Sequence, residues 1–203
     1  MNKKDILIVC ALKVETQGQL DNYFDDERQI LYTGVGKVNA TLKLTQRLHS
    51  SHLHYMPIMP KLVINYGTAG SRKIKKKTLV DCTKFIQRDM DVTGLGFMRG
   101  ETPFEQDPPF IIQQQNVEFN PIGRNATCGT GDNFAEDKSQ YYGEVVDMEA
   151  YALAKVCYLY DVPFISFKYI TDGADEQAHE DWEANLADGI EVFKEKILNE
   201  IKR

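Results

Sequence analysis

Short apolar runs alternate along the chain with longer segments in which apolar residues recur every three or four positions. Ile6–Cys10 is an unbroken apolar run, and Leu62–Tyr66 and Pro163–Ile170 are nearly so. Runs of this length without polar alternation are typical of strands buried on both faces, as in parallel sheets. Further strands are predicted at Ile30–Thr33 and Thr78–Phe85, and Ala126–Gly131 is predicted to end a short strand in a glycine turn.

Four other segments have the spacing of helices. In Asn39–His49, for example, the apolar residues Ala40, Leu42, Leu44 and Leu48 recur in a helical pattern. Helices are also predicted at Leu12–Phe24, Glu149–Tyr160 and Trp182–Lys202. Strands that alternate with helices predict an α/β fold of three layers, α/β/α, around a central mixed, largely parallel sheet. No repeat, linker or low-complexity stretch interrupts the pattern, so we expect residues 1–203 to form a single domain.

The charge and the cysteines narrow the classes of function. A net charge of −6 and an isoelectric point near 5.3 argue against nucleic acid or an anionic membrane as the main partner. No apolar run approaches the ~20 residues that span a bilayer. The four cysteines form no CxxC pair, so we expect no thiolate zinc site and no other metal. These features predict a soluble, cytoplasmic protein with reduced thiols.

Two local features could indicate anion binding. Gly34-Val35-Gly36 begins like a dinucleotide-binding loop, but the third glycine of that motif is missing, and a Walker A lysine pattern is also absent. The basic run Arg72–Lys77 is expected to be a solvated turn between two strands, with an anion or partner site as the alternative. Neither feature predicts a phosphate-binding cofactor.

Three carboxylates follow predicted strands or open predicted helices. Glu15 comes just after the first strand, Glu149 opens a helix, and Asp172 ends the strand after that helix. The carboxyl ends of strands are where α/β sheets gather their ligands. Each acid also has a simpler explanation, because acids are favoured in the first turn of a helix and Asp often caps a turn. Together, three acids could hold a sugar, activate water and protonate a leaving group.

Seven motifs in order give the chain a recognisable identity. They are Ala11-Leu12-Lys13-Val14-Glu15, Thr33-Gly34-Val35-Gly36-Lys37-Val38-Asn39-Ala40, Asn65-Tyr66-Gly67-Thr68-Ala69-Gly70, Asp89-Met90-Asp91-Val92-Thr93, Gly131-Asp132-Asn133-Phe134, Val146-Asp147-Met148-Glu149-Ala150 and Thr171-Asp172-Gly173-Ala174-Asp175. With these motifs the chain resembles the nucleoside phosphorylase/nucleosidase superfamily. Within it, the chain is most similar to the methylthioadenosine/S-adenosylhomocysteine nucleosidases. The resemblance extends from Ile6 to about Trp182.

The resemblance implies roles for the three acids. Asp172 would protonate N7 of the departing purine, which leaves poorly as an anion. Glu149 would accept hydrogen bonds from the 2′ and 3′ hydroxyls of the ribose, with Met148 packed against the sugar ring. Glu15 would be the base that activates the attacking water. General acid catalysis of this kind typically contributes ~10²–10⁴-fold.

The resemblance also implies a set of substrate-binding residues. Phe134 would stack on the adenine, and backbone groups of Phe134 and Ala135 would bind the edge of the base. Trp182 would be an aromatic lid over the apolar 5′ group. Thr68 and Thr171 stand where the family often has serine, and Lys168 stands where it usually has arginine. The segment between Phe134 and Val146 is shorter than in the bacterial relatives.

One position favours water over phosphate as the nucleophile. Phosphorylases of this superfamily usually carry an arginine just before the Gly-Ser/Thr turn, and this chain has Asn65 there. The resemblance therefore implies hydrolysis of 5′-modified adenosines (methylthioadenosine, S-adenosylhomocysteine or 5′-deoxyadenosine) by a homodimer without a cofactor. A phosphorylase or a nucleosidase for another nucleoside is one alternative. A non-catalytic relative that binds nucleosides is another.

Overall fold

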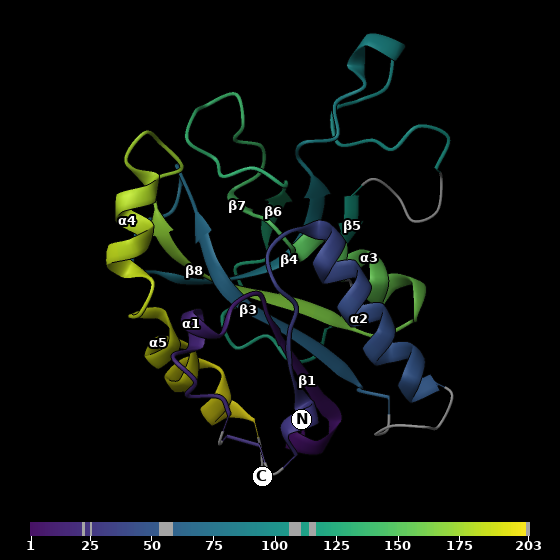
Figure 1. Ribbon diagram of the computed structural model, residues 1–203, viewed down its shortest axis with the longest axis vertical. Helices are drawn as coiled ribbons and strands as arrows, with labels where there is room; N and C mark the ends of the chain where they lie inside the picture. Colours follow the sequence, from purple (N-terminus) through teal and green to yellow (C-terminus); the bar gives the residue numbers. More distant parts are fainter. Residues whose placement is uncertain (22, 25, 53–58, 106–110, 114–116, 202–203) are drawn as a thin grey trace.

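The computed structural model describes residues 1–21, 23–24, 26–52, 59–105, 111–113 and 117–201. A mixed sheet lies between two layers of helices (Figure 1). The strands are β1 Ile6–Cys10, β2 Ile30–Tyr32, β3 Leu62–Gly70, β4 Leu79–Gln87, β5 Ile111–Gln113, β6 Ala126–Thr130, β7 Val145–Asp147 and β8 Phe164–Asp172. The α-helices are α1 Lys13–Thr16, α2 Lys37–His52, α3 Ala150–Leu159, α4 Ala178–Asn185 and α5 Gly189–Lys196, and short 3-10 turns occupy Lys3–Asp5, Glu27–Gln29, Thr93–Leu95 and Leu198–Glu200.

The sheet closes on itself through β8. This strand pairs in parallel with β3 and antiparallel with β4, while β3, β7, β6 and β4 are also neighbours in order. Five strands therefore form a ring, and the Gly70–Val146 pairing between β3 and β7 completes it. Strands β1 and β2 extend the sheet beyond β3, and β5 extends it beyond β4. Five of the eight strand pairings are parallel, as the apolar runs predicted.

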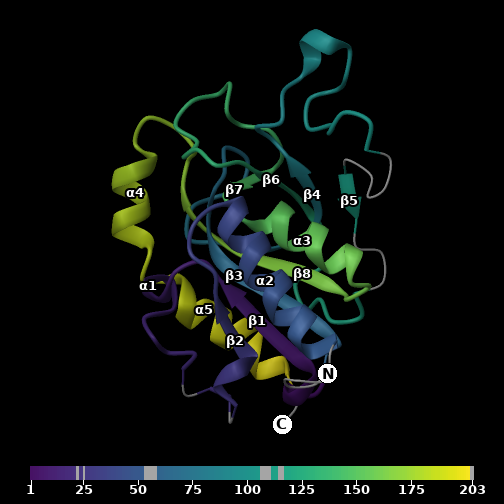
Figure 2. The ribbon, with the colours of Figure 1, turned by 45° about the vertical axis from the view of Figure 1, so that its right-hand side comes forward.

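Two apolar cores lie on opposite faces of the sheet. On one face, Ala40, Leu44 and Leu48 of α2 pack with α3 against the strands. On the other face, Ile190 and Phe193 of α5 pack against the strands. Figure 2 shows α2 and α3 in front of the sheet and α5 behind it. The predicted three-layer α/β fold is confirmed.

Two predicted helices differ from the structure. The helix predicted at Leu12–Phe24 ends at Thr16, because Gln17 and Gly18 take left-handed backbone conformations with φ of 48° and 68°. Beyond them the described residues up to 21 form turns, and Asn22 lies outside the described residues. The terminal helix predicted from Trp182 is wrong in its start and its continuity, since α4 begins at Ala178 and a turn separates it from α5.

The basic run 72–77 and the four cysteines have defined places in the structure. The basic run 72–77 is the turn between β3 and β4, as predicted, and two of its lysines pair with acids of the C-terminal region. Lys76 pairs with Asp181, and the Lys77 Nζ lies 2.9 Å from Asp188 Oδ2. All four cysteines are free and buried. Within the described residues, every helix is too short or too polar to cross a bilayer.

Candidate functional site

A cavity of about 340 Å³ opens at the carboxyl ends of the central strands. Eight of the ten residues predicted to contact substrate or act in catalysis line its wall. They are Glu15, Thr68, Phe134, Ala135, Met148, Glu149, Asp172 and Trp182. The three acids come from separate segments, after β1, at the start of α3 and at the end of β8. The fold therefore brings together carboxylates that are up to 157 residues apart in the sequence.

Glu15 is fixed by three hydrogen bonds. It is 5% exposed, and its Oε1 accepts from the backbone N and from the Oγ1 of Thr68, both at 2.9 Å. Its Oε2 accepts from the backbone N of Leu12 at 3.0 Å. Three donors on two segments leave this side chain little freedom to rotate. Glu15 therefore presents an oriented carboxyl group to the cavity.

Glu149 stands at the N-terminus of α3 and faces the turn that follows β2. Its Oε1 accepts from the backbone N of Gly36 at 2.9 Å. Burial, together with the nearby negative charge of Asp147, raises the pKa of Glu149 from 4.5 to about 8. In the ligand-free protein this carboxyl holds a proton at neutral pH.

Asp172 ends β8 and is held by its neighbours in sequence. The Thr171 Oγ1 donates to Asp172 Oδ2 at 2.8 Å, and the backbone N of Ala174 donates to Oδ1 at 2.9 Å. A side chain on Gly70 of the adjacent β3 would collide with Asp172 Oδ1, so glycine is required there. Burial raises the pKa of Asp172, although the two hydrogen bonds oppose it. A buried carboxyl with a raised pKa can act as a general acid.

A buried ion pair joins Asp147, which lines the cavity, to Lys168. Lys168 Nζ is 2.8 Å from Asp147 Oδ2, and both side chains are 1% exposed. The Thr130 hydroxyl donates to Asp147 Oδ1 at 2.5 Å. Burial would raise the pKa of Asp147, but the charge and hydrogen bond of Lys168 together with hydrogen bonds from Thr130 and the backbone of Ala150 outweigh burial and lower that pKa. The pKa is thus lowered for Asp147 and raised for Glu149, two residues later in the sequence.

Two of the residues predicted to bind substrate are not on the cavity wall. Lys168 is turned toward Asp147 and Gly67 inside the ring of strands. Thr171 is fully buried, with its hydroxyl bonded to Asp172. Both belong to β8, whose side chains are buried along its whole length. They support the acids from behind, which the spacing of the motifs did not indicate.

Aromatic side chains form the outer wall of the cavity. The Phe134 ring lies 6.4 Å from the His179 ring in an edge-to-face arrangement. Trp182, one turn after His179 on α4, is partly buried, and its Nε1 donates to Thr68 Oγ1 at 3.0 Å. This wall leaves room for a flat, largely apolar ligand with polar groups directed toward the acids.

Arg88 and His179 line the cavity although neither was predicted from the sequence. Arg88 is 2% exposed, and its guanidinium donates to Asn133 Oδ1 at 2.8 Å, to the Asn133 backbone O and to the Gln140 backbone O at 3.2 Å. Its Nε is buried without a hydrogen-bond partner in the described part of the chain. The charge of Arg88 therefore fixes the loop after β6. A lone arginine at a strand end gives no sequence signal for that role.

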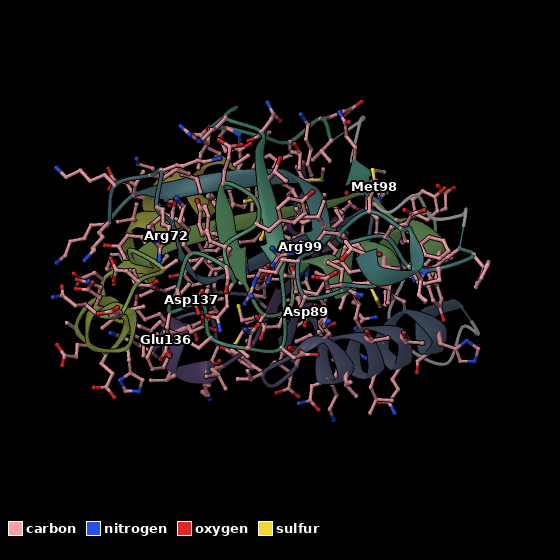
Figure 3. The ribbon with its side chains drawn as sticks, turned by 90° about the horizontal axis from the view of Figure 1, so that it is seen from above. Arg72, Asp89, Met98, Arg99, Glu136 and Asp137 are labelled. Atoms are coloured by element: carbon pink, nitrogen blue, oxygen red, sulfur yellow. The ribbon has the colours of Figure 1, made fainter. Side chains whose placement is uncertain are left out.

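The loops around the mouth of the cavity are tied by polar contacts (Figure 3). The Asp89 carboxylate accepts from Lys37 Nζ at 2.7 Å and from the backbone N of Asp132 at 2.8 Å. Arg99 donates to the backbone O of Arg88 at 3.0 Å and to that of Ser139 at 2.8 Å. These contacts join the segments that follow β2, β4 and β6. Among the described residues, no His, Cys, Asp and Glu side chains cluster as a metal site would require.

Comparisons with known proteins agree with this geometry. The family model of the phosphorylase superfamily matches residues 22–201. The chain belongs to the phosphorylase superfamily. A 5′-methylthioadenosine/S-adenosylhomocysteine nucleosidase of Haemophilus ducreyi is 31% identical to this chain, and the alignment covers 98% of this chain and 88% of that nucleosidase. The nucleosidase of the same description from Geobacillus thermodenitrificans is 27% identical over 98% and 87% of the two chains.

Solved structures of superfamily members share the fold. Futalosine hydrolase of Helicobacter pylori superposes with a TM-score of 0.77, at 22% identity and with 97% of each chain covered. The methylthioadenosine/S-adenosylhomocysteine nucleosidase of Helicobacter pylori has the same TM-score at 21% identity, covering 99% of this chain and 100% of its own. The two structures are equally similar to this one, so the fold alone does not distinguish between their substrates.

Proposed function

We propose that this protein hydrolyses the N-ribosidic bond of 5′-modified adenosines, releasing adenine and the ribose derivative. Its substrates would be methylthioadenosine, S-adenosylhomocysteine or 5′-deoxyadenosine. The observation that carries the proposal is the meeting of Glu15, Glu149 and Asp172 around one cavity, each oriented by its own hydrogen-bond donors. The curated relatives named as nucleosidases support the same reaction class.

Each acid has a distinct task in this reaction. Asp172, whose pKa is raised by burial, gives its proton to the purine as the glycosidic bond breaks. Glu149 binds the ribose diol, and the donated hydroxyl hydrogens favour its ionised form, so substrate binding expels the proton that Glu149 holds in the free protein. Glu15 accepts a proton from the water that attacks the sugar. In this scheme the purine gains a proton from Asp172 and the attacking water loses one to Glu15.

The remaining wall residues fit the other parts of the substrate. Phe134 would stack on the adenine, with backbone groups of Phe134 and Ala135 at the edge of the base. Met148 would pack against the ribose, and Trp182 would cover the 5′ substituent. Thr68 would stay hydrogen-bonded to Glu15. No organic cofactor or metal enters this reaction scheme.

Two arrangements favour water over phosphate as the nucleophile. Asn65 is 2% exposed, and its side chain is used inside the sheet, donating to the Val9 O at 3.0 Å and accepting from Ser166 Oγ at 2.7 Å. Among the described residues that line the cavity, Arg88 is the one lysine or arginine, and both of its Nη atoms are already hydrogen-bonded, which leaves its buried Nε as the donor without a partner. A phosphate would therefore lack the free paired donors that it usually requires.

The test is adenine release from methylthioadenosine, followed by chromatography with and without phosphate. Equal release in both buffers is the expected result. Release only with phosphate would make the protein a phosphorylase. No release at all would overturn the proposal in favour of another nucleoside or a non-catalytic, nucleoside-binding role, which binding titrations with adenine and other bases would separate.

We also propose that residues 1–203 act as one domain, in a cytoplasmic homodimer. Free, buried cysteines suit a reducing compartment. Apolar side chains exposed on α2 and after β4 could be covered by a second copy. They are Val38, Leu42, Leu95 and Met98. Sedimentation of the wild type and of Val38→Ser/Leu42→Ser tests the dimer, which is expected to dissociate in the variant, and a wild-type monomer would contradict it.

A further inference from the structure

Helix α4 makes polar contacts with the ends of β3 and β8, next to the two proposed catalytic acids Glu15 and Asp172. Trp182 Nε1 donates to Thr68 Oγ1 at 3.0 Å, at the end of β3. Asn185 Nδ2 donates to the Thr171 backbone O at 2.9 Å, at the end of β8. Residues three apart lie on the same helix face, so one face of α4 reaches both sites. Figure 1 shows α4 beside the ends of β3 and β8.

The first contact continues to Glu15. An indole N–H can only donate a hydrogen bond, so the Thr68 hydroxyl must accept from Trp182. The single hydroxyl proton of Thr68 is then directed to Glu15 Oε1, 2.9 Å away. Trp182 thereby fixes the rotation of the Thr68 hydroxyl and, through it, one of the donors that orient Glu15.

The second contact continues to Asp172. Asn185 is 8% exposed, which is unusual for an amide unless it is fully bonded. Its bond holds the peptide between Thr171 and Asp172, and the Thr171 hydroxyl donates to Asp172 Oδ2 at 2.8 Å. Each acid is therefore linked to α4 through one threonine.

The helix itself is held in place on both sides of these contacts. Asp181, next to Trp182, pairs with Lys76, and Asp188, just after the helix, pairs with Lys77. Both lysines belong to the basic turn between β3 and β4. The basic turn 72–77 thus anchors α4, the helix that contacts the site.

We propose that Trp182 and Asn185 are positioning residues, through which the seating of α4 on the sheet aligns Glu15 and Asp172 together. Trp182 then has a task beyond covering the 5′ substituent, and its N–H is the group that matters for it. The roles of the two acids rest on the proposed function, whereas the contacts themselves do not.

The decisive experiment is a double-mutant cycle between Trp182 and Thr68. Trp182→Phe keeps an apolar ring but removes the N–H, and we expect kcat to fall about fivefold to tenfold while KM changes less than twofold. Thr68→Val removes the hydroxyl, and the double variant should be no slower than Thr68→Val alone. Additive losses, or a raised KM with unchanged kcat, would show that Trp182 only packs against substrate.

Asn185→Leu tests the second link. It removes the amide at nearly constant volume, and kcat should fall with KM unchanged while the alkaline limb of the kcat–pH profile moves. Glu183→Gln, on the exposed side of α4, is the matched control and should leave kcat, KM and the profile unaltered. A loss that merely follows the unfolded fraction in a thermal melt, without movement of the limb, would assign Asn185 a purely structural role.

A third measurement needs no substrate. Trp182 is the only tryptophan of the chain, so intrinsic fluorescence reports on this side chain alone. Thr68→Val should shift the emission of the ligand-free protein and increase its quenching by acrylamide. Unchanged emission would overturn the Trp182–Thr68 contact. Changed emission in a protein that releases no adenine would uphold the contact and reject only the proposed reaction.

Discussion

The floor of the cavity (Glu15, Asp147, Glu149, Lys168 and Asp172) and its rim (Lys37, Asp89 and Phe134) each contain a lysine–aspartate pair. The two pairs differ in their exposure to solvent. On the floor, the Lys168–Asp147 pair is 1% exposed on each side, whereas at the rim the Lys37–Asp89 pair is 18% and 27% exposed. On the floor, burial and the charge of Asp147 raise the pKa of Glu149, whereas the partners of Asp147 lower its own pKa. At the rim, burial would raise the pKa of Asp89, but hydrogen bonds from Lys37 and from the backbone of Asp132 lower it. The floor therefore holds two neighbouring carboxyls whose pKa values are shifted in opposite directions, and the partly solvated rim holds one whose pKa is lowered by its donors.

Replacing Asp172, the proposed general acid on the floor of the cavity, should have the largest effect. Asp172→Asn keeps the shape and one acceptor oxygen for the backbone N of Ala174 but cannot donate the proton to the purine, so adenine release should fall ~10²–10⁴-fold. Initial rates from methylthioadenosine measure this loss.

The control for that variant is binding rather than turnover. Calorimetric titration with adenine should give nearly the wild-type affinity, because the cavity is otherwise unchanged. If Asp172→Asn turns over at the normal rate, Asp172 is not the general acid.

Removing one lysine from each pair compares floor and rim directly. Lys168→Met leaves Asp147 as an uncompensated buried charge and should lower the free energy of unfolding by about 3–5 kcal/mol. Lys37→Met should lower it by at most about 1 kcal/mol, because that pair is partly solvated. Urea unfolding of both variants gives the two values. Equal losses would remove the distinction between the two regions.

The pH dependence of stability sharpens the account of the floor. The pKa of Glu149 rises from 4.5 in the unfolded chain to about 8 in the folded protein, so its contribution to stability is fully present below pH 4.5. That contribution is lost as pH rises toward 8, since ionisation then favours the unfolded chain. We expect the thermal midpoint of the ligand-free wild type to fall between pH 5 and pH 8.5 by about 4 °C or more.

The matched variant is Glu149→Gln, which cannot ionise. Its thermal midpoint should vary less over the same pH interval, and the difference from the wild type isolates the contribution of Glu149. Identical pH profiles for the two proteins would mean that Glu149 does not titrate in this range.

The smallest effect is expected at the rim. Phe134→Leu keeps an apolar surface but loses the aromatic face, so KM for methylthioadenosine should rise about fivefold. The kcat should change less than KM, because Phe134 is proposed to contact the base through its ring face and has no group that transfers a proton. Steady-state kinetics separate the two, and a fall in kcat at constant KM would place Phe134 in the chemical step instead.

The floor was more predictable from the sequence than the rim. Strands β1, β3 and β8 have apolar runs that indicate burial on both faces, and the acids after β1 and at the end of β8 are visible in the sequence. Local geometry was harder, because the end of α1 depends on left-handed residues at 17 and 18 that the apolar spacing does not reveal. The closed ring of strands depends on pairings between distant segments.

The places of two predicted substrate-binding residues have a physical cause. Lys168 and Thr171 lie on a strand that is buried along its whole length, their partners are other polar side chains, and their contact with substrate stays a prediction. Arg88 was missed because its partners are an amide and backbone carbonyls of a loop, which no pattern of residue types encodes.

The position of β8 in the ring has a consequence for how the chain folds. The strand that joins β3 to β4 is the last one in the sequence, so both strands lack their central neighbour until residue 172 has been made. Long-range pairing of this kind slows folding and leaves open strand edges in intermediates. During synthesis, about a hundred residues follow β3 before β8, the shared partner of β3 and β4, is complete. The last residue of β8 is Asp172, the proposed general acid.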